Sequence, residues 1–335
     1  MNRKYIVFCV IIAAVIIPAV LISASIVPGE PTAGAVYIVY GSEKGDLSYT
    51  DAAYKGLLEA QNDFGIVIRE FTPLDYESLP AILKNSSGAE RPGLIITVGF
   101  QYADFTRELA DENKDIFFLA IDQSGIGSEN LRSYEITSYG DSFLSGVLAA
   151  SATNTGRVGI IMGMQSDVLD TFLRGYSDGV FSINPDVTVE NAYVNQNSTE
   201  GFNDPEKTRR IADLMYQNGT DVLFMCAGYS NMGAFNLAND TLCLYIIGTD
   251  SDQSPLGPGF VLASAVKWVD TVVYNGISEY LGGSFTGGNV VAGLKDGVNG
   301  LLFNPKFEEY NKTVGAWEIT AEEEEAKYLQ QKLFS

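Results

Sequence analysis

The feature that most constrains the fold is an alternation of short apolar runs with helix-like segments. The apolar runs form two series, at 35–41, 65–71, 93–99 and 116–122 and then at 157–163, 188–194, 222–226 and 244–250. Helical patterns separate most of these runs. Uninterrupted apolar runs joined by helices are typical of parallel strands with crossover helices. The sequence therefore predicts an α/β protein.

The restart of this pattern near residue 157 predicts two lobes, each with a parallel sheet flanked by helices. A further strand-like run at 260–267 and a helix at 269–281 follow the second series, and we expect this unit to return to the first lobe. More than one crossing segment would then form the hinge of a closing cleft. The expected boundaries are 35–137 plus about 253–287 for the first lobe, and 138–252 plus about 288–335 for the second.

Residues 1–27 resemble an export signal. Arg3 and Lys4 precede an almost unbroken apolar stretch, which is long enough to stay in the membrane as an anchor. Ser23–Ser25 offers a cleavage site, so cleavage and retention are both open. The two cations would keep the N-terminus in the cytoplasm and place the rest outside. Residues 28–34 read as a short linker.

Charge and composition exclude several classes of function. The chain carries 42 acidic and 21 basic residues, a balance that repels nucleic acid, so no nucleic-acid partner is expected. The acidity fits a soluble extracellular surface or salt adaptation. The chain contains no histidine, which removes Ser-His-Asp triads, Cys-His pairs and His-ligated zinc.

The cysteines and glycosylation motifs give weaker signals. Cys9 lies too early in the apolar segment to be a lipid-modified cysteine. Cys226 and Cys243 would lie at opposite ends of neighbouring strands, and we expect both to be unpaired core thiols. Five sequons suit an exported chain and leave glycosylation possible; they begin at Asn85, Asn197, Asn218, Asn239 and Asn311.

Polar and aromatic residues follow the predicted strands at their carboxyl ends. Ligands of open α/β sheets bind at that edge, so these residues are the candidate ligand site. They are Asp46, Tyr49, Thr50, Phe100 and Asp122 in the first lobe, then Gly228, Tyr229 and Asp250, with Lys267 closing the run at 260–267.

Each candidate also has a purely structural explanation. Asp46 would cap the following helix, Tyr49 would pack as a core aromatic, and Lys267 would pair with Asp250 across the cleft. Asp250 and Asp252 lack a third clustered carboxylate, so no metal site is expected. The glycines match no phosphate-binding motif, so no nucleotide cofactor is expected either.

Nine short motifs appear in order along the chain. They are GDLSYTDAAYKG (45–56), IITVGF (95–100), Ala120-Ile121-Asp122, GVLAA (146–150), GMQSDVLDTFLRGY (163–176), CAGY (226–229), TDSDQ (249–253), SAVKWVD (264–270) and GLKDG (293–297). In this order they resemble the basic membrane protein (BMP) family. These proteins are the substrate-binding components of ABC importers and include purine-nucleoside receptors.

The resemblance implies a two-lobed type I periplasmic-binding-protein-like fold that closes over one ligand without transforming it. By position, Tyr49 is the first-lobe ring that stacks on a base, with Asp46 beside it, and Phe172 or Tyr229 is the second-lobe ring. Stacking of this kind suits any purine face.

The same resemblance assigns the sugar contacts. Asp122 and Asp250 would accept hydrogen bonds from sugar hydroxyls, and Lys267 would donate one. The chain departs from the family at several contact positions. Thr50 replaces an asparagine, tyrosine replaces the commoner phenylalanine at position 49, and Tyr229 replaces a glycine.

The expected function is that of an extracytoplasmic receptor, a monomer and not an enzyme, which delivers a nucleoside to ABC permease subunits. The enzymatic alternative is a nucleoside hydrolase or glycosidase that uses Asp122 and Asp250 as an acid–base pair. A ligand sensor of the same fold is a third hypothesis. A cytoplasmic regulator would need a helix-turn-helix, whereas the N-terminus is apolar.

Overall fold

The computed structural model describes residues 35–334, so the predicted signal or anchor (1–27) and linker (28–34) lie outside the described residues. The strands are β1 (Ala35–Val39), β2 (Ile68–Phe71), β3 (Pro92–Val98), β4 (Phe117–Ile121), β5 (Leu131–Ile136), β6 (Arg157–Met162), β7 (Thr188–Tyr193), β8 (Val222–Cys226), β9 (Tyr245–Asp250), β10 (Val261–Lys267), β11 (Gly288–Ala292) and β12 (Asn299–Phe303). The helices are α1 (Tyr49–Phe64), α2 (Leu79–Asn85), α3 (Ala103–Glu112), α4 (Tyr139–Ala152), α5 (Asp167–Ile183), α6 (Pro205–Gln217), α7 (Asn231–Asp240), α8 (Val269–Leu281), α9 (Asn311–Gly315) and α10 (Glu318–Phe334). Over 35–334, no helix has the length and hydropathy to cross a membrane.

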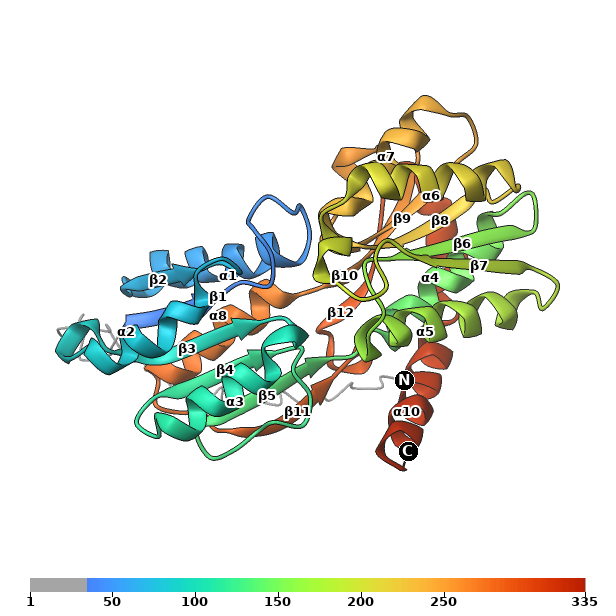
Figure 1. The fold of residues 1–335 in the computed structure, drawn as a ribbon. Coiled ribbons are helices and arrows are strands. Elements are labelled where there is room, and N and C mark those ends of the chain that lie inside the picture. The colour runs from blue at the N-terminus through green and yellow to red at the C-terminus, as the bar shows by residue number, and fades with distance from the viewer. Residues whose placement is uncertain (1–34, 335) are drawn as a thin grey trace, which may run out of the picture. The chain divides into compact units, whose positions relative to one another are not determined.

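The strands form two sheets of six, which confirms the predicted α/β architecture (Figure 1). The order is β11-β5-β4-β3-β1-β2 in the first sheet and β12-β10-β9-β8-β6-β7 in the second. The first sheet pairs in parallel throughout, and in the second only β12 runs antiparallel, against β10. We call each sheet with its helices a lobe.

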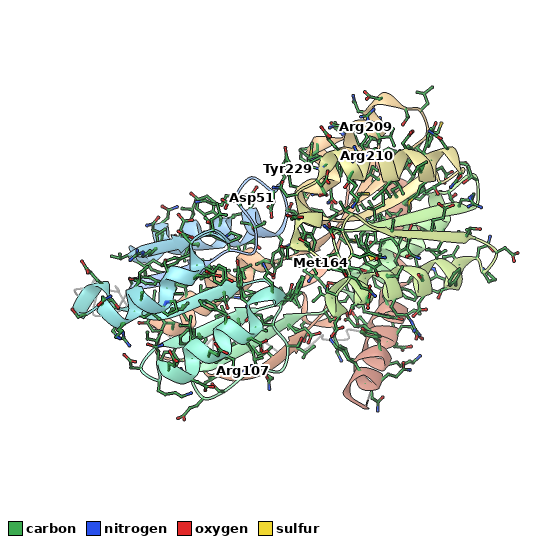
Figure 2. All side chains as sticks on the ribbon, viewed as in Figure 1. Asp51, Arg107, Met164, Arg209, Arg210 and Tyr229 are labelled. Carbon is green, nitrogen blue, oxygen red and sulfur yellow. The ribbon has the colours of Figure 1, made fainter. Side chains whose placement is uncertain are left out.

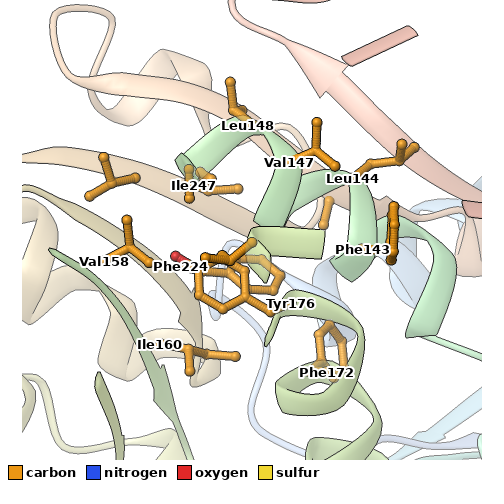
Figure 3. Packing of buried hydrophobic residues seen from close by; sticks show 14 of the residues in the cluster. Phe143, Leu144, Val147, Leu148, Val158, Ile160, Phe172, Tyr176, Phe224 and Ile247 are labelled. Carbon is orange, nitrogen blue, oxygen red and sulfur yellow. The ribbon is translucent and has the colours of Figure 1, made fainter. Parts of the chain in front are cut away.

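Helices cover both faces of each sheet, which explains why the strands are uninterrupted apolar runs. In the first lobe, α1 and α8 pack on one face and α2 and α3 on the other. In the second lobe, α4 and α5 lie on one face and α6 and α7 on the other (Figure 1). Rings from α4, α5 and β8 fill the first of these interfaces, among them Phe143, Tyr176 and Phe224 (Figure 3).

The helices α4 and α5 approach closely because glycines face the contact. A β-carbon on Gly146 of α4 would collide with the carbonyl of Tyr176, and one on Gly179 of α5 would collide with the carbonyl of Phe143. This tight contact holds α4 firmly against α5. The N-terminal turn of α4 carries polar residues that are described below.

The lobe boundaries differ from the prediction at two strands. β10 pairs with β9 and β12, so it belongs to the second sheet, and only α8 of the segment 253–287 packs on the first lobe. β11 pairs with β5 and belongs to the first sheet. The assignment of β10 to the first lobe and of β11 to the second was wrong, because an apolar run does not encode which sheet buries it. Over residues 35–334 the chain passes between the sheets three times: before α4, before α8 and between β11 and β12.

The expectation for the cysteines is wrong in one respect. Cys226 ends β8 and is buried, and Cys243 is exposed before β9. Within residues 35–334 neither forms a disulfide. Cys243 has a φ of 61°, a left-handed conformation typical of turns, in the loop that precedes β9. The apolar letters after it belong to the strand, whereas Cys243 itself belongs to the loop.

Candidate functional site

The loop between β1 and α1 is organised by the carboxylate of Asp46. Its Oδ1 accepts the N–H groups of Ser48 (3.0 Å) and Asp51 (3.1 Å). Its Oδ2 accepts the N–H of Thr50 (2.9 Å) and the hydroxyl of Ser42 (3.0 Å). Asp46 thus caps the first turn of α1, which is its structural explanation. Thr50 is fully buried, and its hydroxyl bonds to that of Ser42 at 2.7 Å.

The same loop binds the second lobe directly. Ser48 Oγ donates to Asp250 Oδ2 at 2.6 Å. The carbonyl of Leu47 accepts from Ser251 Oγ at 2.8 Å and from Gln253 Nε2 at 3.1 Å. Leu47 has a φ of 54° and Asp250 one of 65°, so both sides of this contact adopt conformations that non-glycine residues rarely adopt. We call these three bonds the loop contact; none was predicted from the sequence.

A buried ion pair joins the lobes beside the loop contact. Lys267 Nζ, at the end of β10, lies 2.8 Å from Asp122 Oδ2, after β4. Asp122 Oδ1 accepts the N–H of Ile136 at 2.9 Å, and Asp122 also has a positive φ of 57°. Burial alone would lower the pKa of Lys267, but the charges of Asp122 and Asp250 outweigh burial and raise it. Lys267 thus pairs with Asp122 and not, as expected, with Asp250, and its ammonium is charged.

Two of the predicted rings flank this ammonium. Lys267 Nζ lies 5.9 Å from the ring centre of Tyr49 and 5.4 Å from that of Phe172, within the range of cation–π attraction. The Tyr49 hydroxyl is buried near Asp122 but meets no partner among residues 35–334 in hydrogen-bond geometry. Burial, with the nearby charge of Asp122, raises the pKa of Tyr49 well above its usual value. Phe172 is itself buried and packs on Phe224.

Three other predicted residues lie in the turns that follow β8 and β3. Gly228 has a φ of 55° in the turn after β8, a conformation that glycine adopts without strain. Tyr229, in the same turn, is 41% exposed (Figure 2). Phe100 follows β3 in the first lobe and packs against the core of the second. The structure thus brings Tyr49, Asp122, Phe172, Asp250 and Lys267 together, whereas Asp46 and Thr50 support the loop.

Phe202 is a second-lobe ring that was not among the predicted site residues. Its ring occupies the space that a side chain at Gly163 would need, and it also lies against Gly228. It therefore covers the ends of β6 and β8, where a ligand of a parallel sheet binds. Phe202 comes from a short turn after β7, and the only available signal was a lone aromatic in the polar stretch TEGFNDPE.

Comparison with known proteins identifies the family of this fold and site. Residues 34–328 match the family described as "ABC transporter substrate-binding protein PnrA-like". The chain belongs to this family. The motif-based resemblance and the two-lobed fold are both confirmed.

Curated relatives agree with this family assignment. The chain is 32% identical to the ABC transporter nucleoside-binding protein BmpA of Lactococcus lactis, over 75% of this chain and 76% of that one. It is 31% identical to basic membrane protein D of Borreliella burgdorferi, over 85% of each chain. Among solved structures, an ABC transporter solute-binding protein of Aeropyrum pernix superposes with a TM-score of 0.73 at 29% identity, over 80% of this chain and 76% of that one.

Two carboxyl groups of the PnrA-like site carry shifted pKa values. Burial raises the pKa of Asp250 to about 6, although Lys267 and the Ser48 hydroxyl favour its ionised form. Burial raises the pKa of Asp141 to about 8, against the opposing charge of Lys267. Asp141 was not predicted as a site residue, because an acidic residue in the first turn of a helix reads as an ordinary cap.

The family is one of substrate-binding proteins. In this site both oxygens of Asp122 are engaged, one by Lys267 and the other by a backbone amide. Within residues 35–334, no group of three His, Cys, Asp or Glu is placed to hold a metal ion. Proteins of this family bind a small-molecule ligand for an ABC transporter outside the cytoplasm.

Proposed function

We propose that this substrate-binding protein captures a purine nucleoside between its two lobes. The observation that carries the proposal is the arrangement around Lys267. A charged donor, two aromatic rings and two carboxylates from both lobes meet at one place, at the carboxyl ends of both sheets. The Lactococcus relative named as nucleoside-binding supports this ligand class.

Each ligand contact has a physical basis. Tyr49 offers a ring face to a purine, and base–aromatic stacking contributes about 1–3 kcal/mol per base. The second ring comes from Phe172, Tyr229 or Phe202, of which Phe172 lies nearest to Lys267 in the structure. Asp122 and Asp250 accept from ribose hydroxyls, since a carboxylate oxygen that accepts one bond keeps a second lone pair. Lys267 has donors beyond the one that Asp122 receives.

The proposed cellular role follows from the family. The protein is a monomer that works outside the cytoplasm and delivers its ligand to ABC permease subunits. Its N-terminal segment is either a membrane anchor or a cleaved signal, as the sequence of residues 1–27 suggests. Lobe closure over the ligand involves the three crossing segments between the sheets.

A ligand screen tests the proposal. The purified full-length chain is heated with nucleosides, free bases, sugars or amino acids, and the melting temperature is recorded. Only a ligand that binds the native state raises it, so we expect a rise with at least one purine nucleoside and none with free ribose or amino acids. A rise with amino acids or sugars alone would contradict the nucleoside assignment.

Recovery of the ligand separates a receptor from a hydrolase. After incubation with inosine we expect the nucleoside to be recovered intact by chromatography. Release of hypoxanthine and ribose in proportion to protein concentration would favour the carboxylate hydrolase instead, with Asp122 and Asp250 as its acid–base pair. A sensor would bind the ligand identically but fail to restore nucleoside uptake to cells that lack their own receptor.

A further inference from the structure

A group of buried polar atoms without partners surrounds the N-terminal turn of α4. Three of them are Ser138 Oγ, Asp141 Oδ2 and Ser142 Oγ, and the fourth is Asn299 Oδ1 at the start of β12. Each of these residues is at most 2% exposed. No residue of 35–334 donates to or accepts from these four atoms. Buried polar atoms of this kind are costly unless a ligand or water completes them.

This group adjoins the proposed ligand site. Asn299 is the direct cross-strand neighbour of Lys267 in the β10–β12 pair. Its amide donates to the carbonyl of Thr137 at 2.5 Å, which ties β12 to the segment that enters α4. The charge of Asp141 acts on Lys267, and the charge of Asp250 acts on Asp141. The unpartnered atoms therefore lie at the second-lobe side of the same site.

Asp141 is the most informative member of the group. Its Oδ1 accepts the N–H of Ser142 at 2.8 Å, and this is the one donor that the described chain gives it. The cation nearby, Lys267, is engaged by Asp122 instead. A fully buried carboxylate with one donor and no cation partner retains its proton, and the proton then resides on the free Oδ2. The protonated Oδ2 of Asp141 is then a hydrogen-bond donor that has no acceptor among residues 35–334.

The other charged groups around Asp141 favour the same state. Glu325 of α10 accepts the N–H groups of Gly140 and Leu294 beside it, and Asp250 lies at the end of β9. Both negative charges raise the pKa of Asp141, whereas Lys267 on β10 lowers it. Cys226, at the end of β8, is a buried thiol whose own pKa is raised, so it adds no negative charge.

We propose that Asp141 is a ligand-binding residue of the second lobe, which donates its Oδ2 proton to an acceptor atom of the bound nucleoside, either a ring nitrogen or an oxygen. The inference rests on the proposed function and adds a specificity determinant to it. A ligand without that acceptor leaves the proton of Asp141 unpaired and binds more weakly. A ligand with a negative charge at that position is tolerated, because the group that faces it is a neutral donor.

The test uses calorimetric titration of the full-length chain with adenosine, which has no titratable group near neutral pH. Asp141→Ala removes the donor, and we expect the affinity to fall about tenfold or more. Asp141→Asn keeps a donor at the same place, and we expect its affinity to stay within about threefold of the unaltered protein. Asp221→Asn is the matched control, because Asp221 is a buried carboxylate at the start of β8, at the opposite end of the sheet.

The pH dependence gives a second readout. The unaltered protein should bind adenosine about tenfold more weakly at about pH 9 than at about pH 7, where Asp250 is already largely ionised. Roughly one molecule in ten retains the Asp141 proton one unit above its pKa of about 8. Asp141→Asn should lose this dependence. If it keeps the full dependence, or if Asp141→Ala binds as tightly as the unaltered chain, the role of Asp141 is wrong.

Nucleoside analogues distinguish direct contact from an indirect effect through Lys267. Adenosine analogues that each lack one acceptor, such as 1-deaza, 3-deaza, 7-deaza and deoxyribose forms, are titrated against the unaltered chain and Asp141→Ala. For one analogue the loss of affinity should not add to that of the variant. Additive losses for every analogue would contradict direct contact. Failure of the unaltered chain to bind any nucleoside would instead contradict the proposed function, and the role of Asp141 with it.

Discussion

Asp46 and Asp141 are buried carboxyl groups that both lie at the N-terminus of a helix, one in each lobe, yet their surroundings differ. Asp46 accepts four hydrogen bonds, two from its own loop and two from the first turn of α1. Asp141, in α4, accepts one and keeps an oxygen that has no partner in the described part of the chain. Burial is the same, but the number of donors is not. The first-lobe loop is thus completed by the protein, whereas the second-lobe turn has hydrogen-bonding capacity left for a ligand.

The largest expected effect concerns the ion pair that connects the two regions. Lys267→Met leaves Asp122 buried without its cation, and we expect the free energy of unfolding to fall by about 4 kcal/mol. Lys55→Met is the matched control, since the Lys55–Asp270 pair has an exposed lysine and is expected to contribute below about 1 kcal/mol. Urea denaturation measures both. Equal losses in the two variants would show that burial of the Lys267–Asp122 pair has no special importance.

Asp46 and Asp141 should differ in the stability that each loses when it is replaced by asparagine. Asp46→Asn places an amide N–H₂ against backbone donors, and we expect it to cost about 3 kcal/mol of stability. Asp141→Asn replaces a neutral group by another neutral group of equal size, and we expect a cost below about 1 kcal/mol at pH 7. Thermal unfolding of the ligand-free proteins checks this difference. A larger loss of stability in Asp141→Asn than in Asp46→Asn would contradict the claim that Asp46 depends more on its hydrogen-bond donors.

The raised pKa values predict how stability varies with pH. Burial raises the pKa of Asp141 to about 8 and that of Asp250 to about 6, so the folded protein holds protons that the unfolded chain releases near pH 4. Stability is therefore full at low pH with respect to these groups and falls as pH rises through 6 and 8. We expect a loss of about 3 kcal/mol between pH 6 and pH 9. The chain has no histidine to add a competing titration in this range.

Matched variants assign this pH dependence. Asp141→Asn should flatten the upper part of the stability curve, and Asp250→Asn the lower part. A curve that rises steadily from pH 6 to pH 9 in the unaltered protein would show that neither carboxyl group retains its proton when folded.

The smallest expected effect concerns the loop contact. Ser48→Ala removes the hydroxyl that donates to Asp250, and we expect a loss of about 1 kcal/mol in the free energy of unfolding. The pKa of Asp250 should rise further, because the lost hydrogen bond favoured its ionised form. Ser251→Ala tests the neighbouring bond to the Leu47 carbonyl, which involves no charge, and should cost less. A cost of Ser48→Ala below that of Ser251→Ala would argue against a charge-assisted contact.

Local sequence patterns predicted most of the fold. Uninterrupted apolar runs such as VLFMC identified strands that are buried on both faces, and the helix predicted at 269–281 is α8. β5 was missed because LRSYEI alternates polar and apolar residues and so forms no uninterrupted apolar run. The sheet to which β10 belongs depends on its neighbours β9 and β12, and no local pattern carries that information.

The candidate site was predicted only in part, because local patterns do not show which distant residues meet. Residues that end strands were found by position, and Lys267, Asp122 and Tyr49 do gather at one place. The role of Asp46 in capping α1 was foreseen as a structural alternative. Ser48 and Asp141 were not foreseen, since the first is a common loop hydroxyl whose partner lies 202 residues away. Asp141 was not foreseen because its raised pKa depends on its burial beside Lys267.

The measurement that tests the account most directly is a calorimetric titration of purine nucleosides into the full-length chain and its Tyr49→Ala variant. Tyr216→Ala, which removes a ring on α6 bonded to the carbonyl of Leu242, is the control. We predict saturable binding of one nucleoside per chain, retained in the control and weakened about tenfold or more in Tyr49→Ala, because the stacked ring is lost. Unchanged affinity in Tyr49→Ala, or no binding of any nucleoside by the unaltered chain, would contradict capture of a base between the lobes.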